Sequence, residues 1–231
     1  TTDTVVATVT AGNNPLGVAV NPVLDRAYVA NFSVAGGVTV INTTDNTVVT
    51  TITAGTNSYG VAVNPTGTRA YVTNRSSGDL SVIDTSDNTV VATIAIGTNP
   101  EAVTVSPDGT RVYVASAGSL HVIDTATNTI IETIATGLAG SGVAVNPNGS
   151  LVYVVGSNAN TGRVIDTAYN MLVGTFSASG GLGDVAITPD GSYAWVSTTT
   201  GEAYLIDVNP ASASYNQAVA VLDLGTAATG L

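Results

Sequence analysis

The chain has 231 residues, of which 44% are apolar and only 9% are charged, so it holds ample material for a hydrophobic core. Sixteen acidic residues oppose five arginines without any lysine, and a net charge of −11 excludes the broad basic face that nucleic-acid binding needs. Because cysteine is absent, disulfides and thiolate metal sites are excluded too.

The first predicted element is a β-branched strand from Thr4 to Val9. Residue 1 already lies inside this pattern, with no basic or apolar leader before it, so we expect that any signal peptide has been removed or was never included. Turn residues then interrupt every apolar run well short of the ~18 residues that a spanning helix needs, and we expect no membrane insertion.

An aromatic-Val pair recurs along the chain at intervals of 40 to 43 residues. Its aromatic members are Tyr28, Tyr71, Tyr113, Tyr153 and Trp195. A second word, Val-Ile-Asp or a close variant, follows each pair in step and ends at Asn42, Asp84, Asp124, Asp166 and Asp207. Two words in phase indicate a repeat architecture, in which these residues have structural roles.

Each repeat is expected to hold four short strands. In the second repeat they centre on Ala62, on Tyr71, on Ile83 and on Val90. The first turn carries Pro and Gly, which suit a tight hairpin. The third turn carries Asp and Asn, whose side chains bond to the backbone of their own turn, so we expect a turn-forming role for the repeated aspartates.

Four antiparallel strands in a period near 42 residues predict an all-β fold, a β-propeller of four-stranded antiparallel blades. We expect five complete repeats, plus extra outer strands at both ends of the chain. The blades are predicted at residues 15–52, 58–94, 100–134, 141–176 and 183–224. Residues 1–231 are then one propeller domain, or a truncated part of a larger one.

The words Tyr71-Val72-Thr73-Asn74 and Pro107-Asp108-Gly109-Thr110, with Val-Ile-Asp-Thr following, resemble the YVTN repeat of prokaryotic surface-layer and secreted propellers. The resemblance covers essentially the whole chain. It implies an extracellular or cell-surface location in a prokaryote, and it extends to structural components, binding proteins and more distant lyases. The motif is specific for the fold and says little about function.

The last predicted element is an outer strand from Ala218 to Leu224, and residues 225–231 align with the start of another inner strand. Three arrangements follow: a five-bladed ring with a redundant strand, a fragment of a larger ring, or an outer strand donated to a neighbouring molecule. We favour the fragment. The third arrangement predicts self-association through the segment from Thr4 to Val9 or the one from Ala218 to Leu224.

The sequence contains no nucleophile elbow, Walker loop, paired-cysteine site or zinc helix, so we assign no catalytic residue, metal ligand or cofactor. His121 is the only histidine, and because unrelated residues fill its slot in the other repeats, we expect it on a strand surface. Lyases that the resemblance reaches depend on a histidine with a bound metal, which one histidine does not reproduce. A calcium site in the loop from Asp84 to Asn88 is the alternative to a purely structural turn.

Departures from the repeat are expected to mark function where loops line one mouth of the channel. The candidate ligand-binding residues are Tyr59, Arg75, Glu101 and Asp184. The competing interpretation is ordinary loop variation on a solvated face. Four Asn-Xaa-Ser/Thr sequons, at Asn31, Asn42, Asn74 and Asn148, fall at strand ends or turns.

These observations favour a non-enzymatic extracellular or cell-surface propeller that acts as a structural or interaction domain. The expected partners are other cell-surface proteins or glycans. The alternative is a small-molecule-binding or lyase-type propeller that uses the channel mouth, with a divalent metal.

Overall fold

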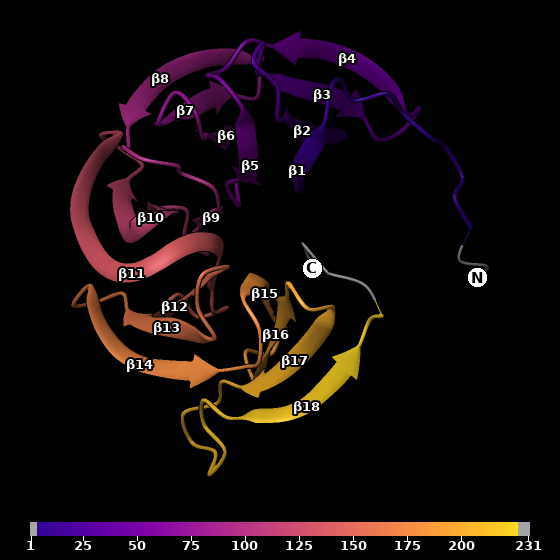
Figure 1. Cartoon of the computed structure of the whole chain (residues 1–231). Coiled ribbons are helices and arrows are strands. Elements are labelled where there is room, and N and C mark those ends of the chain that lie inside the picture. Colours follow the sequence, from indigo (N-terminus) through magenta and orange to yellow (C-terminus); the bar gives the residue numbers. More distant parts are fainter. Residues whose placement is uncertain (1–3, 226–231) are drawn as a thin grey trace. The chain divides into compact units, whose positions relative to one another are not determined.

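A computed structural model describes residues 4–225 of the chain. The chain divides into two compact units, whose described parts are residues 4–95 and residues 96–225. The described part is built from antiparallel strands joined by short turns and loops, and consecutive strands pair within each sheet (Figure 1). This arrangement confirms the predicted all-β propeller fold.

The first unit contains two four-stranded sheets, with the strands in chain order from inner to outer. The strands of its first sheet are β1 (Pro15–Val20), β2 (Arg26–Asn31), β3 (Val38–Asn42) and β4 (Thr47–Ile52). The strands of its second sheet are β5 (Ser58–Val63), β6 (Arg69–Asn74), β7 (Asp79–Asp84) and β8 (Thr89–Ala95).

The second unit contains a six-stranded sheet and a four-stranded sheet. The six strands are β9 (Val103–Val105), β10 (Arg111–Asp124), β11 (Thr129–Val145), β12 (Leu151–Gly156), β13 (Thr161–Asp166) and β14 (Met171–Ser177). The four strands are β15 (Leu182–Ile187), β16 (Tyr193–Thr198), β17 (Glu202–Asp207) and β18 (Ala218–Asp223).

The predicted set of five separate four-stranded blades differs from this arrangement at the third and fourth repeats, which share the six-stranded sheet. Strand β10 contains both the Tyr-Val pair and the Val-Ile-Asp motif of the third repeat. Strand β11 begins as the outer strand of the third repeat and continues as the inner strand of the fourth. The links that precede the second and third repeats turn at an Asn with positive φ, Asn57 and Asn99, and the link that precedes the fifth turns at Gly180. Here Ala139 takes that place and pairs with Ala117, so the link stays extended.

The two predicted terminal strands have different outcomes. Strand β18 forms and pairs with β17, as expected for an outer strand. Residues 4–9 form no strand, although their sequence matches β8, and Val5 and Val6 are 86% and 91% exposed. A strand needs a hydrogen-bonded neighbour. Residues 4–9 have the composition of a strand, but in the structure no other strand pairs with them. Of the predicted inner strand at residues 225–231, all but the first residue lie outside the described part.

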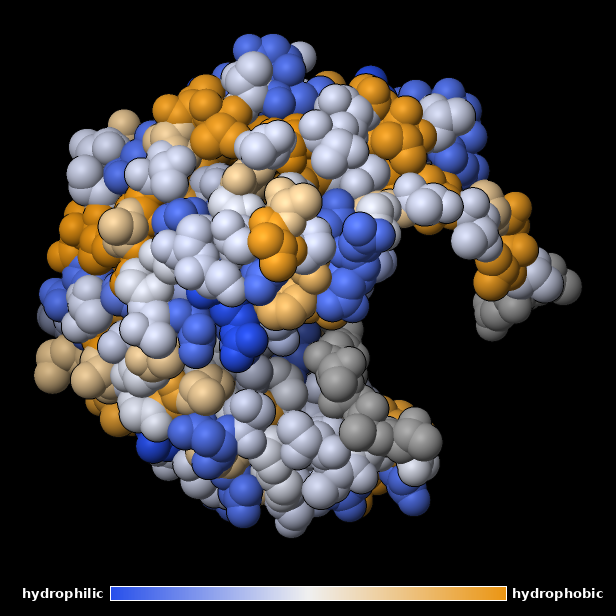
Figure 2. Space-filling model, turned by 45° about the horizontal axis from the view of Figure 1, so that its top comes forward, coloured by the Kyte–Doolittle hydropathy of each residue, from blue (hydrophilic) through white to orange (hydrophobic). Residues whose placement is uncertain are grey.

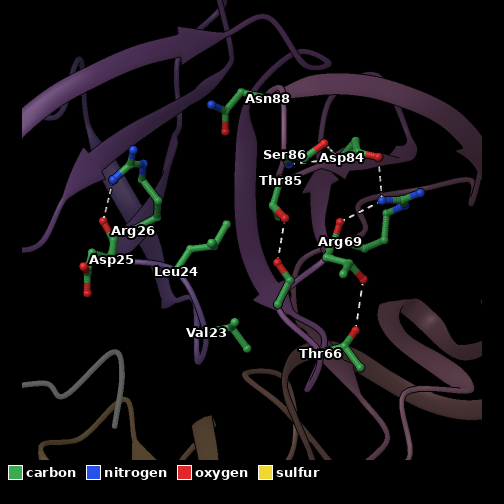
Figure 3. A pocket seen from close by; sticks show the side chains of 12 residues that line it. Val23, Leu24, Asp25, Arg26, Thr66, Arg69, Asp84, Thr85, Ser86 and Asn88 are labelled. Atoms are coloured by element: carbon green, nitrogen blue, oxygen red, sulfur yellow. Dashed lines mark hydrogen bonds and ion pairs between the residues drawn. The ribbon is translucent and has the colours of Figure 1, made fainter.

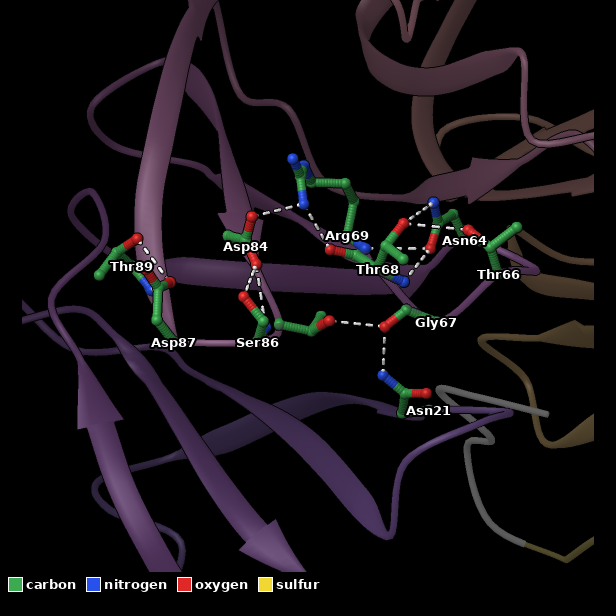
Figure 4. A network of polar contacts seen from close by, with 11 residues as sticks. Asn21, Asn64, Thr66, Gly67, Thr68, Arg69, Asp84, Ser86, Asp87 and Thr89 are labelled. Carbon is green, nitrogen blue, oxygen red and sulfur yellow. Dashed lines mark hydrogen bonds and ion pairs between the residues drawn. The ribbon is translucent and has the colours of Figure 1, made fainter.

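Asparagine and glycine recur in the sequence because the turns need a left-handed backbone. The asparagine that opens the outer strand in each of the first four repeats has a positive φ, between 52° and 60°. These residues are Asn46, Asn88, Asn128 and Asn170. Asparagine tolerates this region better than other non-glycine residues. In the first turn of the second repeat, Asn64 Oδ1 accepts the Thr68 and Arg69 N–H groups at 2.8 and 3.0 Å (Figure 4).

The core of each unit lies between neighbouring sheets. In the first unit, Tyr28 and Val40 of the first sheet pack with Ala70 and Val72 of the second. The repeat tyrosines Tyr28, Tyr71, Tyr113 and Tyr153 are at most 1% exposed, and their burial raises the pKa of each phenol. Trp195, which holds the same slot in the last repeat, is half-buried.

The outer strands leave apolar side chains in solvent, scattered among hydrophilic ones on the face that Figure 2 presents. In β4 and β8, Val49 and Val91 are 42% and 50% exposed, and in β18 Val221 is 56% exposed. These strands carry no lysine or arginine. Charged side chains commonly protect strand edges from pairing with other chains, and β4 and β8 contain none.

Replacing Tyr71 with Ala is expected to lower the free energy of unfolding by about 3–5 kcal/mol, because its ring is 1% exposed and its removal leaves a cavity. Urea denaturation followed by tryptophan fluorescence and circular dichroism measures the change. The control is Tyr169→Ala, at a side chain that is 77% exposed, which should change stability by less than about 0.5 kcal/mol. A loss below about 1 kcal/mol for Tyr71→Ala would contradict the role of the ring in the core.

Candidate functional site

Two aromatic rings and an arginine meet on one end of the first unit. The Phe32 and Tyr59 rings lie edge to face, with centroids 5.8 Å apart and planes at 87°. The Arg75 guanidinium carbon lies 6.0 Å from the centroid of the Phe32 ring, within cation–π distance. We call Phe32, Tyr59 and Arg75 the aromatic–arginine cluster.

Three segments of the first unit bring the cluster together. Phe32 follows β2, Tyr59 lies in β5, and Arg75 follows β6 (Figure 1). Because antiparallel strands alternate in direction, the end of β2, the start of β5 and the end of β6 share one end of their sheets. The predicted side chains Tyr59 and Arg75 therefore meet through Phe32.

Backbone hydrogen bonds fix these segments to one another. The Arg75 N–H donates to the Asn57 carbonyl at 3.0 Å, and the Asn57 N–H donates to the Ser33 carbonyl at the same distance. Asn57 has a φ of 56°, and its side-chain amide donates to Ser76 Oγ at 2.8 Å. The loops that carry the cluster are thus held before any ligand arrives, which limits the entropy lost on binding.

The chemistry of the cluster suits recognition better than catalysis. All three side chains are half-buried, so each presents part of its surface to solvent. Aromatic rings offer flat apolar faces, and a guanidinium offers five N–H donors in a planar fork. Such a surface can stack against the apolar face of a sugar ring or a side chain and donate hydrogen bonds beside it.

The other two candidate residues belong to the second unit. The Glu101 N–H donates to the Ala115 carbonyl at 3.0 Å. Asp184 lies in β15, where its Oδ1 accepts the Val185 N–H at 2.8 Å and its own N–H donates to Ser197 Oγ at 2.9 Å. A Cβ on Gly142 would lie 2.6 Å from Asp184 Oδ1, so only glycine permits this close approach.

The repeated aspartates accept hydrogen bonds from the backbone of their own turns. Asp84 Oδ1 accepts the Ser86 N–H at 2.9 Å, and Asp124 Oδ1 accepts the Thr127 N–H at the same distance. Asp166 and Asp207 do the same for Tyr169 and Asn209 at 2.9 and 3.0 Å. Arg69 also forms a 2.6 Å ion pair with Asp84 (Figure 4). Hydrogen bonds to the carboxylate lower the pKa of Asp84, Asp124 and Asp207.

The prediction that His121 lies on a strand surface is wrong, because the residue is only 8% exposed. Its Nε2 lies 3.0 Å from Ser116 Oγ, and its Nδ1 lies 3.2 Å from Thr133 Oγ1. Burial lowers its pKa, which favours the neutral imidazole. Variation at this repeat position does not reveal burial, because the Ser116 and Thr133 hydroxyls that partner the imidazole lie in other segments of the repeat.

The sequons differ in accessibility. Asn31 and Asn74 are 3% and 0% exposed, and Asn74 donates to Asp79 Oδ1 and Ser81 Oγ at 2.7 and 2.9 Å. In the folded chain these two side chains are closed to modification. Asn42 is half-buried and Asn148 is exposed.

Within residues 4–225, no three His, Cys, Asp or Glu side chains gather closely enough to hold a metal ion. The same residues contain no helix with the length and apolar character of a membrane span.

Phe32 is the member of the cluster that sequence reasoning missed. It follows the Tyr-Val-Ala-Asn word of the first repeat, in the slot that Arg75 fills in the second. The signal was present in the sequence, because an aromatic residue and an arginine at one loop position are departures from the repeat of the kind that marked Tyr59.

Comparison with known proteins supports the fold alone. No protein-family model matches the chain, and no curated protein matches it in sequence. Among solved structures it is similar to hydrazine synthase of Kuenenia stuttgartiensis, with a TM-score of 0.80 and 23% identity over 87% of this chain and 65% of the other. A functionally unknown protein from Desulfotomaculum acetoxidans gives a TM-score of 0.79 and 16% identity, over 92% and 71%. The chain thus spans about 65% of the hydrazine synthase chain that it matches.

Replacing Asp124 with Asn should destabilise the chain at neutral pH and have a smaller effect in acid. A carboxyl whose pKa is lowered on folding stabilises the fold above its ordinary value of 3.8, and this stabilisation is lost as the pH falls through the lower folded pKa. Thermal unfolding of both proteins between pH 7 and pH 2.5 measures the difference. A difference that stays constant over this range would show that the charge of Asp124 does not stabilise the turn.

Proposed function

We propose that this chain is a non-enzymatic extracellular or cell-surface propeller that serves as a structural or interaction domain, with the aromatic–arginine cluster as its contact site. The observation that carries the proposal is the meeting of Phe32, Tyr59 and Arg75 on ordered loops. Glycans or surface proteins are the proposed partners, and the paired aromatic rings favour glycans. Glu101 and Asp184 remain proposed ligand contacts in the second unit.

The location and the family are part of the same proposal. Membership of the YVTN-repeat family, a prokaryotic cell-surface location and five complete repeats all rest on the recurring words of the sequence. A low charged fraction and the absence of lysine agree with an exported protein built for a structural role. No cofactor is part of the proposal.

Replacing Phe32 with Ala should weaken saccharide binding about tenfold or more, because the ring supplies both a stacking face and the support for Arg75 and Tyr59. The measurement is binding of the full chain to an array of prokaryotic surface polysaccharides, followed by calorimetric titration of the strongest ligand.

The control for Phe32→Ala is Val34→Ala, a side chain on the same loop that is 84% exposed, which should leave binding unchanged. Circular dichroism checks that both variants fold. Binding that survives Phe32→Ala, or a wild-type chain that binds no saccharide on the array, would contradict the glycan-binding proposal.

Self-association is a second candidate function, and exposed strand-forming segments favour it. Residues 4–9 pair with no strand in the structure, and β18 is exposed along its whole length. A segment of strand composition can pair with a free sheet edge of a second copy, as in strand-donation assemblies.

Deleting residues 4–9 should convert oligomers of the full chain to monomers if these residues are the donated strand. Light scattering with size-exclusion chromatography gives the mass, and deletion of residues 218–224 tests the other terminal strand. A matched control is Val5→Asp with Val6→Asp, which keeps the length but opposes strand pairing. A wild-type chain that is already monomeric, or oligomers that persist in all variants, would contradict strand donation through these segments.

A further inference from the structure

A cavity of about 750 Å³ opens between the two sheets of the first unit, at the end opposite the aromatic–arginine cluster. One wall is the β1–β2 turn with Val23, Leu24 and Arg26. The facing wall comes from the second sheet and includes Arg69 with Asp84 (Figure 3). We call this space the Arg26 cleft. Its volume falls in the range of pockets that hold small molecules.

The repeat supplies a matched cleft for comparison, inside the second unit. That cavity, of about 510 Å³, is lined by Arg111, Thr167 and neighbouring turn residues at the equivalent repeat positions. Arg111 crosses it, and its Nη1 donates to the Thr167 carbonyl at 2.9 Å and to Asn170 Oδ1 at 3.3 Å. There the arginine joins two neighbouring repeats.

Arg26 holds the same repeat position as Arg111 but makes a different contact. Its Nη1 donates to the Asp25 carbonyl of its own turn at 2.8 Å (Figure 3). Asn88, the counterpart of Asn170, accepts a 3.4 Å hydrogen bond from the Tyr28 hydroxyl. Arg111 therefore bridges the cleft of the second unit, whereas Arg26 bonds within its own turn.

Arg26 also lacks the ion pair that its counterpart in the second repeat forms. In the second sheet Arg69 lies opposite Asp84 in strand register, and the two form an ion pair of 2.6 Å. In the first sheet the residue opposite Arg26 is the neutral Asn42. The exposed carboxylates of Asp25 and Asp45 are the nearby acidic groups of the same sheet, and Arg26 contributes only weakly to the lowered pKa of Asp45.

An apolar pair lies beside this arginine. The first turn of the other four repeats has glycine with a φ between 69° and 76° at its tip. In the first repeat Leu24 stands at that position after Val23, and the two side chains are 41% and 66% exposed. Exposed aliphatic side chains next to an arginine without its usual aspartate suit a ligand with an anionic end and an apolar body.

We propose that the Arg26 cleft binds a small organic carboxylate. The guanidinium group of Arg26 pairs with the carboxylate, while the apolar part of the ligand covers Val23 and Leu24. Arginine binds carboxylates through two parallel N–H donors, a geometry that lysine cannot supply. A peptide C-terminus with an aliphatic side chain and a uronic acid share this chemistry. The site is separate from the aromatic–arginine cluster and does not depend on the function proposed for it.

Titration calorimetry of the full chain tests the proposal with matched probes. N-acetyl-leucine and N-acetyl-leucinamide differ in the carboxylate alone, and glucuronate and glucose form the corresponding sugar pair. At least one acid should bind about tenfold or more tightly than its neutral partner, and its affinity should fall as salt increases. Preference for N-acetyl-leucine indicates a peptide terminus, and preference for glucuronate indicates an acidic sugar.

Two variants locate the binding in the cleft. Arg26→Gln removes the cation, and Asn42→Asp restores the carboxylate that the repeat places opposite the arginine, which then competes with the ligand. Each should weaken binding of the acid about tenfold or more. Arg111→Gln is the control, because that arginine already bridges its own cleft, and it should bind the acid as the wild type does.

Asn42→Asp keeps the test decisive if Arg26→Gln fails to fold, since it adds a pairing already present in the second sheet. Equal affinity for acid and neutral probes, no binding of any acid, or unchanged affinity in Asn42→Asp would overturn the proposal.

Discussion

The structure depends on burying the repeat tyrosines Tyr28, Tyr71, Tyr113 and Tyr153, which are at most 1% exposed. A single four-stranded sheet exposes an apolar face, and it becomes stable only when a neighbour covers that face. Tyr28 meets Ala70 and Val72, and Tyr153 meets Ala194 and Val196, so a large ring from one sheet fills the space above small side chains of the following one. The same fit explains why an aromatic residue recurs every 40 to 43 residues.

Repetition made the fold predictable from the sequence, and it also set the limits of prediction. Strands and turns follow from alternating β-branched residues and from asparagine or glycine where the backbone is left-handed, as at Asn88 and Gly67. The sequence pattern does not reveal the merging of the third and fourth repeats, where Ala139 pairs with Ala117 and the link between the repeats stays extended. The predictions of a surface position for His121 and of a strand at residues 4–9 are wrong for another reason, because burial and strand pairing depend on neighbours distant in sequence.

The candidate site was predicted in part. Tyr59 and Arg75 were identified as departures from the repeat, and they meet through Phe32. The sequence alone does not predict the Arg26 cleft, because Val23, Leu24 and Asn42, taken singly, resemble ordinary variation within the repeat. Their meaning appears only when the register places Asn42 opposite Arg26, where the next sheet has an aspartate. Positions that obey the repeat build the scaffold, and the positions that depart from it in the first unit gather at its two ends.

A substitution scan of the whole chain that reads stability and saccharide binding separately tests this division most directly. Protease resistance reports stability, and retention on the array polysaccharide that the wild type binds most strongly reports recognition. The account predicts that stability losses recur with the repeat, at the buried tyrosines and the strand words. Binding losses without stability losses should concentrate at Phe32, Tyr59 and Arg75. Binding losses that recur with the same period as the stability losses would contradict it.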